Sequence, residues 1–189
     1  MASSTNNIEL SSQQKAELDE MIKEAENSCL SDEIFTRVIV LEGYLSKSIL
    51  LLRPLNLIDS NLWAGNTAKD YPHTLDGPIS STFTQASVKD DGIMAAVVYA
   101  GKNIVGVECG WLLAWADSKA NGKRLYAECG DISKYNCIDW GCIEEKLNNS
   151  KKLAIIVSDH ETGTSVQATL SGVDFPLQTQ DKLGAIFYG

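Results

Sequence analysis

The chain has 189 residues, of which 44% are hydrophobic and 22% are charged, and its formal net charge is −9 at pH 7. A chain of this size buries about 70% of the surface that its unfolded form exposes, which is enough for one globular domain without disulfides or metals. The acidic balance argues against nucleic acid and anionic membranes as partners, because both attract clustered Lys and Arg.

The N-terminal part of the chain is predicted to be helical. Residues 1–10 are small and polar and are expected to form a flexible tail, whereas residues 11–189 are expected to form a single globular domain. Ser11 and Gln14 fit a capping box, and the apolar residues that follow them recur at helical spacing. A first amphipathic helix is therefore expected to begin at Ser11.

A second helix is predicted between the capping residue Ser31 and Gly43, because apolar side chains again recur at helical spacing. The β-branched run Val38–Val40 makes a strand the alternative. The helices would then occupy about residues 11–43, and a β-sandwich would occupy about residues 46–189.

The next part of the chain alternates apolar segments with turn residues. Residues 46–52 predict a buried strand, which the Arg53-Pro54 pair ends because proline cannot donate a hydrogen bond to a central ladder. Residues 55–63 predict a bent or edge strand. The segment 64–85 is rich in Gly, Pro, Asn and Asp, and it predicts one or two long loops around a short strand near residues 79–84.

The segment Ile93–Cys129 is predicted to be the centre of the sheet. It contains an Asn-Gly pair, which is typical of a hairpin turn, so residues 111–116 should pair antiparallel with residues 123–129. Trp111 and Trp115 have the same parity in a strand, and both are expected to point into the interior of the sandwich.

The C-terminal part predicts one helix and three strands. A short helix is expected over residues 140–147, with Asp139 at its N-cap. Strands are expected over residues 152–158, 164–170 and 178–189. Helices at the front and many short strands after them predict an α+β fold, mainly β, built on an antiparallel β-sandwich.

No catalytic motif is present in the chain. It has no G-x-S-x-G elbow, no H-E-x-x-H sequence, no Walker sequence and no G-x-G-x-x-G. The two histidines, His73 and His160, are expected in solvated loops, although a cryptic enzyme that uses either of them with a Cys or an acid is an alternative. We therefore expect a protein that is not an enzyme and holds no cofactor.

The cysteines and the N-terminus indicate the compartment. No secretory signal is recognised and no apolar run is long enough to span a membrane, so a cytoplasmic protein is expected. The odd set of cysteines is expected to be reduced and buried, and it lacks the close C-x2-C pairs of structural zinc sites, so no metal is expected. Cys137 and Cys142 are candidates for redox sensitivity. The set is Cys29, Cys109, Cys129, Cys137 and Cys142.

Three aromatic residues are predicted in or near loops: Trp63, Tyr71 and Tyr135. A flat aromatic ring binds a quaternary ammonium group, or the C–H face of a sugar. These three residues are therefore candidates for binding a lipid head group or a glycan. The alternative is that they are scattered exposed aromatics without a ligand, which is common in proteins.

Three segments that follow one another resemble the plant jasmonate-induced protein family. They correspond to that family's V-V-Y-G strand, its W-[ML]-L-A-W and V-Y-T-E strands, and its D-W-x-x-I-x-x-x-L-x-x-S helix. The segments are AAVVYAGKN (Ala95–Asn103), GWLLAWADSKANGKRLYAEC (Gly110–Cys129) and IDWGCIEEKLNNS (Ile138–Ser150). YPHTLDGPISSTF (Tyr71–Phe83) resembles another segment of the family, but it has Asp76, Pro78 and Ile79 where Asn, Gln and Trp are usual.

The resemblance implies a non-enzymatic plant protein induced by jasmonate, wounding, salt or osmotic stress. The layout is also similar to that of fungal lipid-binding proteins and actinoporin-like toxins, which use a β-sandwich flanked by short helices. That likeness implies a stress and defence protein that binds a lipid head group or a glycan through its loops. A structural or storage-like stress protein without a ligand is the alternative.

Overall fold

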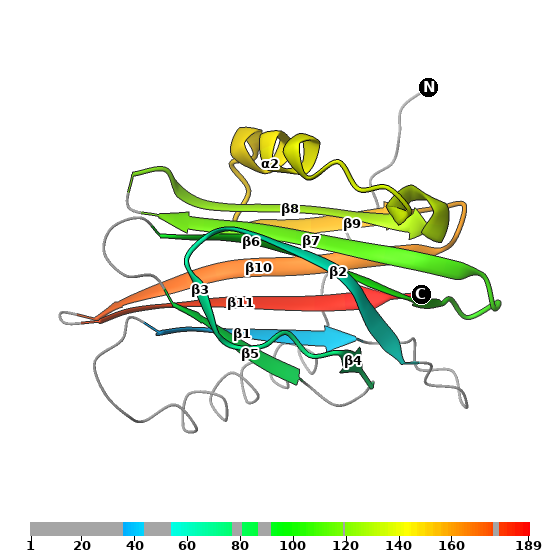
Figure 1. The fold of residues 1–189 in the computed structure, drawn as a ribbon, viewed down its shortest axis with the longest axis horizontal. Helices are drawn as coiled ribbons and strands as arrows, with labels where there is room; N and C mark the ends of the chain where they lie inside the picture. The colour runs from blue at the N-terminus through cyan, green and yellow to red at the C-terminus, as the bar shows by residue number, and fades with distance from the viewer. Residues whose placement is uncertain (1–35, 44–53, 77–80, 87–91, 119, 176–177) are drawn as a thin grey trace. The chain divides into compact units, whose positions relative to one another are not determined.

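The computed structural model describes residues 36–43, 54–76, 81–86, 92–118, 120–175 and 178–189. All of these residues belong to one compact unit, Asp32–Gly189. They form two β-sheets that pack face to face, with helices on the outer side of the smaller sheet (Figure 1). The expected helix at Ser11, the expected strand over residues 46–52 and Cys29 lie outside the described residues.

The larger sheet has six strands in the order β3-β5-β1-β11-β10-β9. Its pairs are antiparallel, except that β1 runs parallel to β11. The expected strands at 152–158, 164–170 and 178–189 are confirmed as β9, β10 and β11. The strands of this sheet are β1 (Thr36–Gly43), β3 (Asn66–Lys69), β5 (Ser81–Ala86), β9 (Ala154–Asp159), β10 (Thr164–Phe175) and β11 (Gln178–Tyr188).

Strand β1 corrects the prediction of a helix between Ser31 and Gly43. Ile39 pairs with Leu183 of β11 on one side and with Phe83 of β5 on the other. Two neighbouring strands therefore satisfy the backbone groups that a helix would have satisfied internally. The β-branched run within β1 suits this extended conformation, so the alternative of a strand was the right one.

The smaller sheet has five antiparallel strands in the order β4-β2-β6-β7-β8. The predicted hairpin is confirmed, with Trp115 of β7 opposite Leu125 of β8. Strand β2 is bent by two register shifts and is covered by β4 only at its first two residues, so the bent edge strand is confirmed. The strands are β2 (Leu55–Ala64), β4 (Thr74–Leu75), β6 (Ile93–Lys102), β7 (Glu108–Ser118) and β8 (Gly122–Asp131).

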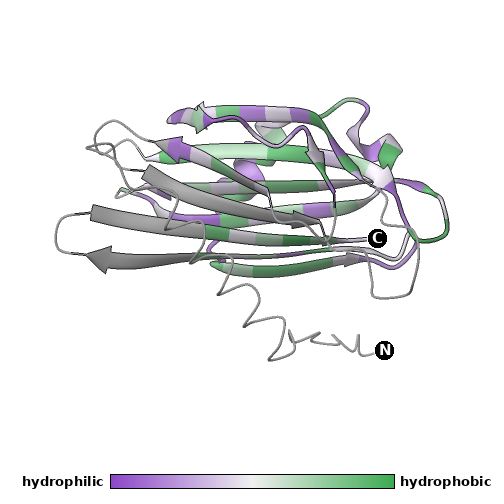
Figure 2. Cartoon of the chain, turned by 90° about the horizontal axis from the view of Figure 1, so that it is seen from below, coloured by the Kyte–Doolittle hydropathy of each residue, from purple (hydrophilic) through white to green (hydrophobic). Residues whose placement is uncertain are grey.

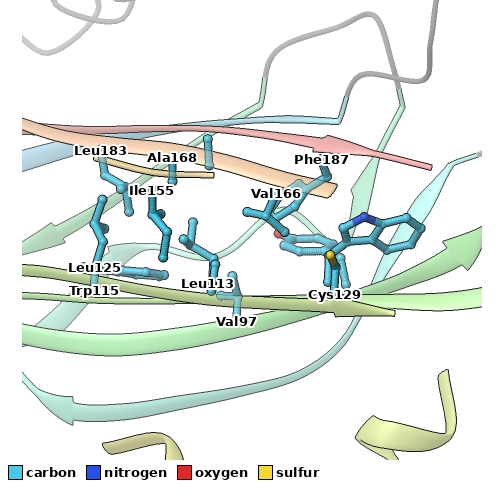
Figure 3. Close-up of a cluster of buried hydrophobic side chains, with 14 of the residues drawn as sticks. Val97, Leu113, Trp115, Leu125, Cys129, Ile155, Val166, Ala168, Leu183 and Phe187 are labelled. Atoms are coloured by element: carbon cyan, nitrogen blue, oxygen red, sulfur yellow. The ribbon is translucent and has the colours of Figure 1, made fainter. Parts of the chain in front are cut away.

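The main core lies between the two sheets. Trp111 and Trp115 are both fully buried there, as their parity predicts. Side chains of β6, β7 and β8 meet those of β9, β10 and β11 in this layer (Figure 3). The labelled residues are Val97, Leu113, Trp115, Leu125, Cys129, Ile155, Val166, Ala168, Leu183 and Phe187.

A second apolar layer covers the outer face of the smaller sheet. The short 3-10 helix η1 (Ile132–Tyr135) and the helix α2 (Trp140–Asn149) lie against it, and Ile143 and Leu147 are buried beneath α2. Asp139 caps α2 by accepting a hydrogen bond from the backbone N–H of Cys142, as predicted. Strands β6 and β7 are thus buried on both faces, which explains their nearly continuous apolar sequences. Among the described residues, no helix is long and apolar enough to cross a membrane.

Candidate functional site

The connection between β6 and β7 carries a cluster of exposed aliphatic side chains. We call Asn103–Val107 the β6–β7 tip. Ile104 is 67% exposed, Val105 is 78% exposed and Val107 is 43% exposed. The connection lies at the end of the strands in Figure 1 and is coloured largely hydrophobic in Figure 2. Contiguous exposed apolar side chains of this kind mark contact sites for membranes, proteins or ligands.

The tip is held in one shape by Asn103, whose side chain is inside the turn. This residue is 1% exposed, and its Oδ1 accepts hydrogen bonds from the backbone N–H groups of Val105 (3.1 Å) and Val107 (2.8 Å). Its backbone N–H donates to Val107 O (2.9 Å), and its backbone O accepts from Gly106 N (3.0 Å). Gly106 has φ +91°, a left-handed conformation that glycine adopts without strain. The aliphatic side chains therefore point outward from a preformed turn.

The tip is also anchored to the turn between β9 and β10. Asn103 Nδ2 donates a hydrogen bond to Thr162 O (2.8 Å), and Thr162 Oγ1 donates to Asp159 Oδ2 (2.6 Å). The hydrogen bond from Thr162 lowers the pKa of Asp159 below its usual value, so this carboxylate is ionised at neutral pH. The two turns therefore form one rigid end of the sandwich.

The base of this end is fixed by two further contacts. Trp111 Nε1 donates a hydrogen bond to Tyr188 O (2.9 Å), which ties β7 to the end of β11. Cys109 Sγ donates to Val107 O (3.3 Å), and burial raises the pKa of this thiol above its usual value. Because a buried thiol with a raised pKa is a poor nucleophile, Cys109 acts here as a structural residue.

Charged side chains surround the tip. Lys102 and Glu108 flank it and form a salt bridge of 3.3 Å, and Lys134 Nζ lies 4.0 Å from Asp159 Oδ1. Hydrogen bonds from Ser133 lower the pKa of Asp131, which lies opposite Cys109 on β8. The apolar tip is thus flanked by charged groups on the adjoining strand ends and turns.

The structure divides the three predicted ligand-binding residues between the two apolar layers. Tyr71 is partly buried and packs against the main core, where its ring centroid is 4.7 Å from that of Phe83 and its OH accepts a hydrogen bond from Gln85 Nε2 (2.8 Å). Trp63 and Tyr135 belong instead to the outer layer, and Tyr135 is only 6% exposed. The three residues therefore do not share one surface, and their role in ligand binding stays a prediction.

The histidines and cysteines show no assembled catalytic or metal site in the described part of the chain. His73 and His160 are both exposed, and no three His, Cys, Asp or Glu side chains among these residues lie close enough to hold a metal ion. The four described cysteines are free thiols. Cys109 and Cys129 are buried as expected, but Cys137 and Cys142 are exposed, because they lie before and in the first turn of α2 on its solvent side.

Sequence reasoning passed over the β6–β7 tip because the segment Ile93–Cys129 was treated as the centre of the sheet, without separate attention to its connecting residues. A signal was available: Asn103 and Gly106 are turn residues, so the aliphatic residues between and after them had to lie outside the strand.

No protein-family model matches the chain. A curated protein from Atriplex canescens, named as a jasmonate-induced protein homolog, is 29% identical over 150 residues, which are 77% of this chain and 78% of that protein. The crystal structure of the lipid binding protein Nakanori has a TM-score of 0.56 at 9% sequence identity, and the likeness covers 93% of this chain and 79% of that one. The predicted resemblance is therefore confirmed: the chain is similar in sequence to a jasmonate-induced protein homolog, and it has the β-sandwich fold of a lipid-binding protein.

Proposed function

We propose that this protein is a non-enzymatic, stress-responsive module that binds lipid surfaces through the β6–β7 tip. The observation that carries the proposal is the set of exposed aliphatic side chains of Ile104, Val105 and Val107 on a turn that Asn103 holds rigid. Such side chains gain free energy when they leave water for the boundary between head groups and acyl chains. The likeness in fold to a lipid-binding protein supports this proposal, and the sequence similarity to a jasmonate-induced protein homolog supports a role in stress responses.

The size of the apolar contact indicates how strong such binding would be. Complete burial of an Ile or Val side chain contributes about 1.5–3 kcal/mol, so the exposed parts of the three side chains would contribute roughly 3–6 kcal/mol. A free energy of about 4 kcal/mol corresponds to a dissociation constant near 1 mM. The tip alone therefore supports weak and reversible attachment, and stable attachment needs contacts with head groups as well.

The experiment is vesicle flotation of the full chain with two double variants. In Ile104→Ser/Val105→Ser, the tip loses most of its apolar surface. In the control Leu153→Ser/Ile156→Ser, two other exposed aliphatic side chains are changed beside and in β9, where they are 50% and 47% exposed. We expect the tip variant to bind vesicles roughly 30-fold more weakly or worse, which corresponds to a loss of at least about 2 kcal/mol.

The control variant should bind vesicles within about twofold of the wild type, since changes at exposed positions outside a contact site have small effects. Equal losses in both variants would mean that binding is not made through the tip. A wild-type chain that floats with no vesicle would refute the lipid-binding function. Binding on a glycan array under the same conditions would then favour glycan binding as the function.

A further inference from the structure

The charged side chains near the β6–β7 tip include more carboxylates than ammonium groups. We call this set the acidic collar. Its members flank the tip or lie on the two segments beside it. Asn103 Nδ2 of the tip donates a hydrogen bond to Thr162 O of the β9–β10 turn, and Asp131 at the end of β8 pairs with Cys109 at the start of β7. Four carboxylates and two ammonium groups give it a net charge of −2 when His160 is counted as neutral. The collar consists of Lys102, Glu108, Asp131, Lys134, Asp159 and Glu161.

The two cations of the collar are already matched by neighbouring acids. Lys102 lies 3.3 Å from Glu108, and Lys134 lies 4.0 Å from Asp159. Asp131 and Glu161 are therefore the carboxylates in excess, and both are exposed to solvent. Their position matters because a bound tip would bring them to the level of the lipid head groups.

This local excess decides which membranes the tip can approach. Charges interact across water over about 8–10 Å at physiological salt. The charges of the collar therefore interact electrostatically with a membrane at the tip, while salt screens most of the remaining protein charge. An anionic surface changes binding by roughly fivefold for each unit charge close to it. Two excess carboxylates would therefore weaken binding to an anionic surface by roughly 25-fold relative to an uncharged one.

We infer that the ligand of the β6–β7 tip is the surface of an electrically neutral, zwitterionic bilayer, and that the acidic collar excludes anionic bilayers. The inference rests on the lipid-binding function proposed above and adds the class of membrane to it. The tip supplies attraction that does not depend on lipid charge, because its three exposed side chains are aliphatic. The collar supplies the selectivity.

The test compares binding of the full chain to vesicles of phosphatidylcholine and to vesicles of phosphatidylcholine mixed with phosphatidylserine, at low and at high ionic strength. Two variants with the same change in net charge separate the collar from the rest of the surface. Glu161→Lys reverses a collar charge in the exposed β9–β10 turn. The matched control Glu145→Lys reverses a charge on the exposed side of α2, which packs on the outer face of the smaller sheet (Figure 1).

The wild type should bind the neutral vesicles at least tenfold more tightly at low ionic strength, and high salt should reduce this preference. Glu161→Lys should raise binding to the anionic vesicles by at least fivefold and leave binding to the neutral vesicles within about twofold, whereas Glu145→Lys should change neither by more than about twofold. Equal effects of the two variants would overturn the role of the collar.

The failures of the two proposals can be told apart. Wild-type binding to the anionic vesicles that equals or exceeds binding to the neutral ones, while Ile104→Ser/Val105→Ser still abolishes both, would overturn the selectivity and leave lipid binding intact. An absence of binding to both kinds of vesicle would refute the lipid-binding function itself.

Discussion

Asn103 is the residue on which the shape of the β6–β7 tip depends, and Asn103→Ala is the sharpest test of that role. The substitution removes three hydrogen bonds at once from a side chain that is 1% exposed. At about 0.5–1.5 kcal/mol for each bond, the expected loss in the free energy of unfolding is about 2–4 kcal/mol. After the substitution, water can hydrate some of the backbone groups that Asn103 had bonded, so the loss in the free energy of unfolding should lie toward the lower end of this range.

The same substitution should also weaken vesicle binding. Without the bonds from Asn103, the backbone between Ile104 and Gly106 gains conformations that must be given up when the tip enters the membrane. Ordering a residue costs about 1–2 kcal/mol of backbone entropy, so binding should fall by tenfold or more although no aliphatic side chain has been removed.

Three measurements check this prediction: urea denaturation, hydrogen exchange at the amides of Val105 and Val107, and vesicle flotation. Asn121→Ala is the matched control, because Asn121 lies in the exposed β7–β8 turn and makes its hydrogen bonds through backbone atoms. A loss in stability below about 0.5 kcal/mol together with unchanged amide protection in Asn103→Ala would refute the proposed role of the side chain.

Three other predictions concern Gly110, the carboxylate of Asp159 and the buried thiols. Gly110→Ala should lower the free energy of unfolding by about 1–3 kcal/mol in urea denaturation, because the added Cβ atom would lie 2.3 Å from the Tyr135 ring. The loss should be smaller in a Tyr135→Leu background. Asp159→Asn should cost up to about 1 kcal/mol at neutral pH. Because the folded pKa of Asp159 is lowered, this contribution is fully present above the ordinary carboxyl pKa near 3.9 and is lost as the pH falls through the lower folded pKa. The difference from wild type should therefore shrink in acid, and a difference that stays constant with pH would exclude the carboxylate as its cause. The variant Cys29→Ser/Cys137→Ser/Cys142→Ser keeps only the buried thiols of Cys109 and Cys129. Because burial raises the pKa of both, they should react with a thiol reagent only after unfolding. Rapid labelling of the native protein would contradict their burial.

The elements that the sequence predicts well are those with local signals. The Asn-Gly turn defined the β7–β8 hairpin, and Asp139 defined the start of α2. Strand β1 has no such signal, because its partners β5 and β11 are distant in sequence and supply the hydrogen bonds that make it a strand. Local periodicity alone therefore favoured a helix there. Strands β3 and β4 were missed for a related reason, since two to four residues are too few to show an alternating pattern.

The candidate site was harder to predict than the fold. Aromatic residues within a loop-like sequence were predicted to be exposed. Tyr71 instead packs against Phe83 and Trp115 at the main core, and Tyr135 is buried in the outer layer. Neither burial follows from local composition, because it depends on which face of which sheet the segment crosses. Asn103 and Gly106 mark a turn after β6, but the extent to which Ile104 and Val105 are exposed depends on which segments pack beside that turn.

The parallel pairing of β1 with β11 also has a consequence for synthesis on the ribosome. Strand β1 lies between β5 and β11, so the larger sheet stays in two fragments until the C-terminal strand has emerged. All strands of the smaller sheet are synthesised by Asp131, and its inner face, with Trp111 and Trp115, then waits for β9, β10 and β11 to cover it. The nascent chain thus presents a broad aromatic surface until β9, β10 and β11 have emerged, and long-range pairing of this kind makes folding slow. We therefore expect the nascent chain to be bound by chaperones that recognise hydrophobic segments.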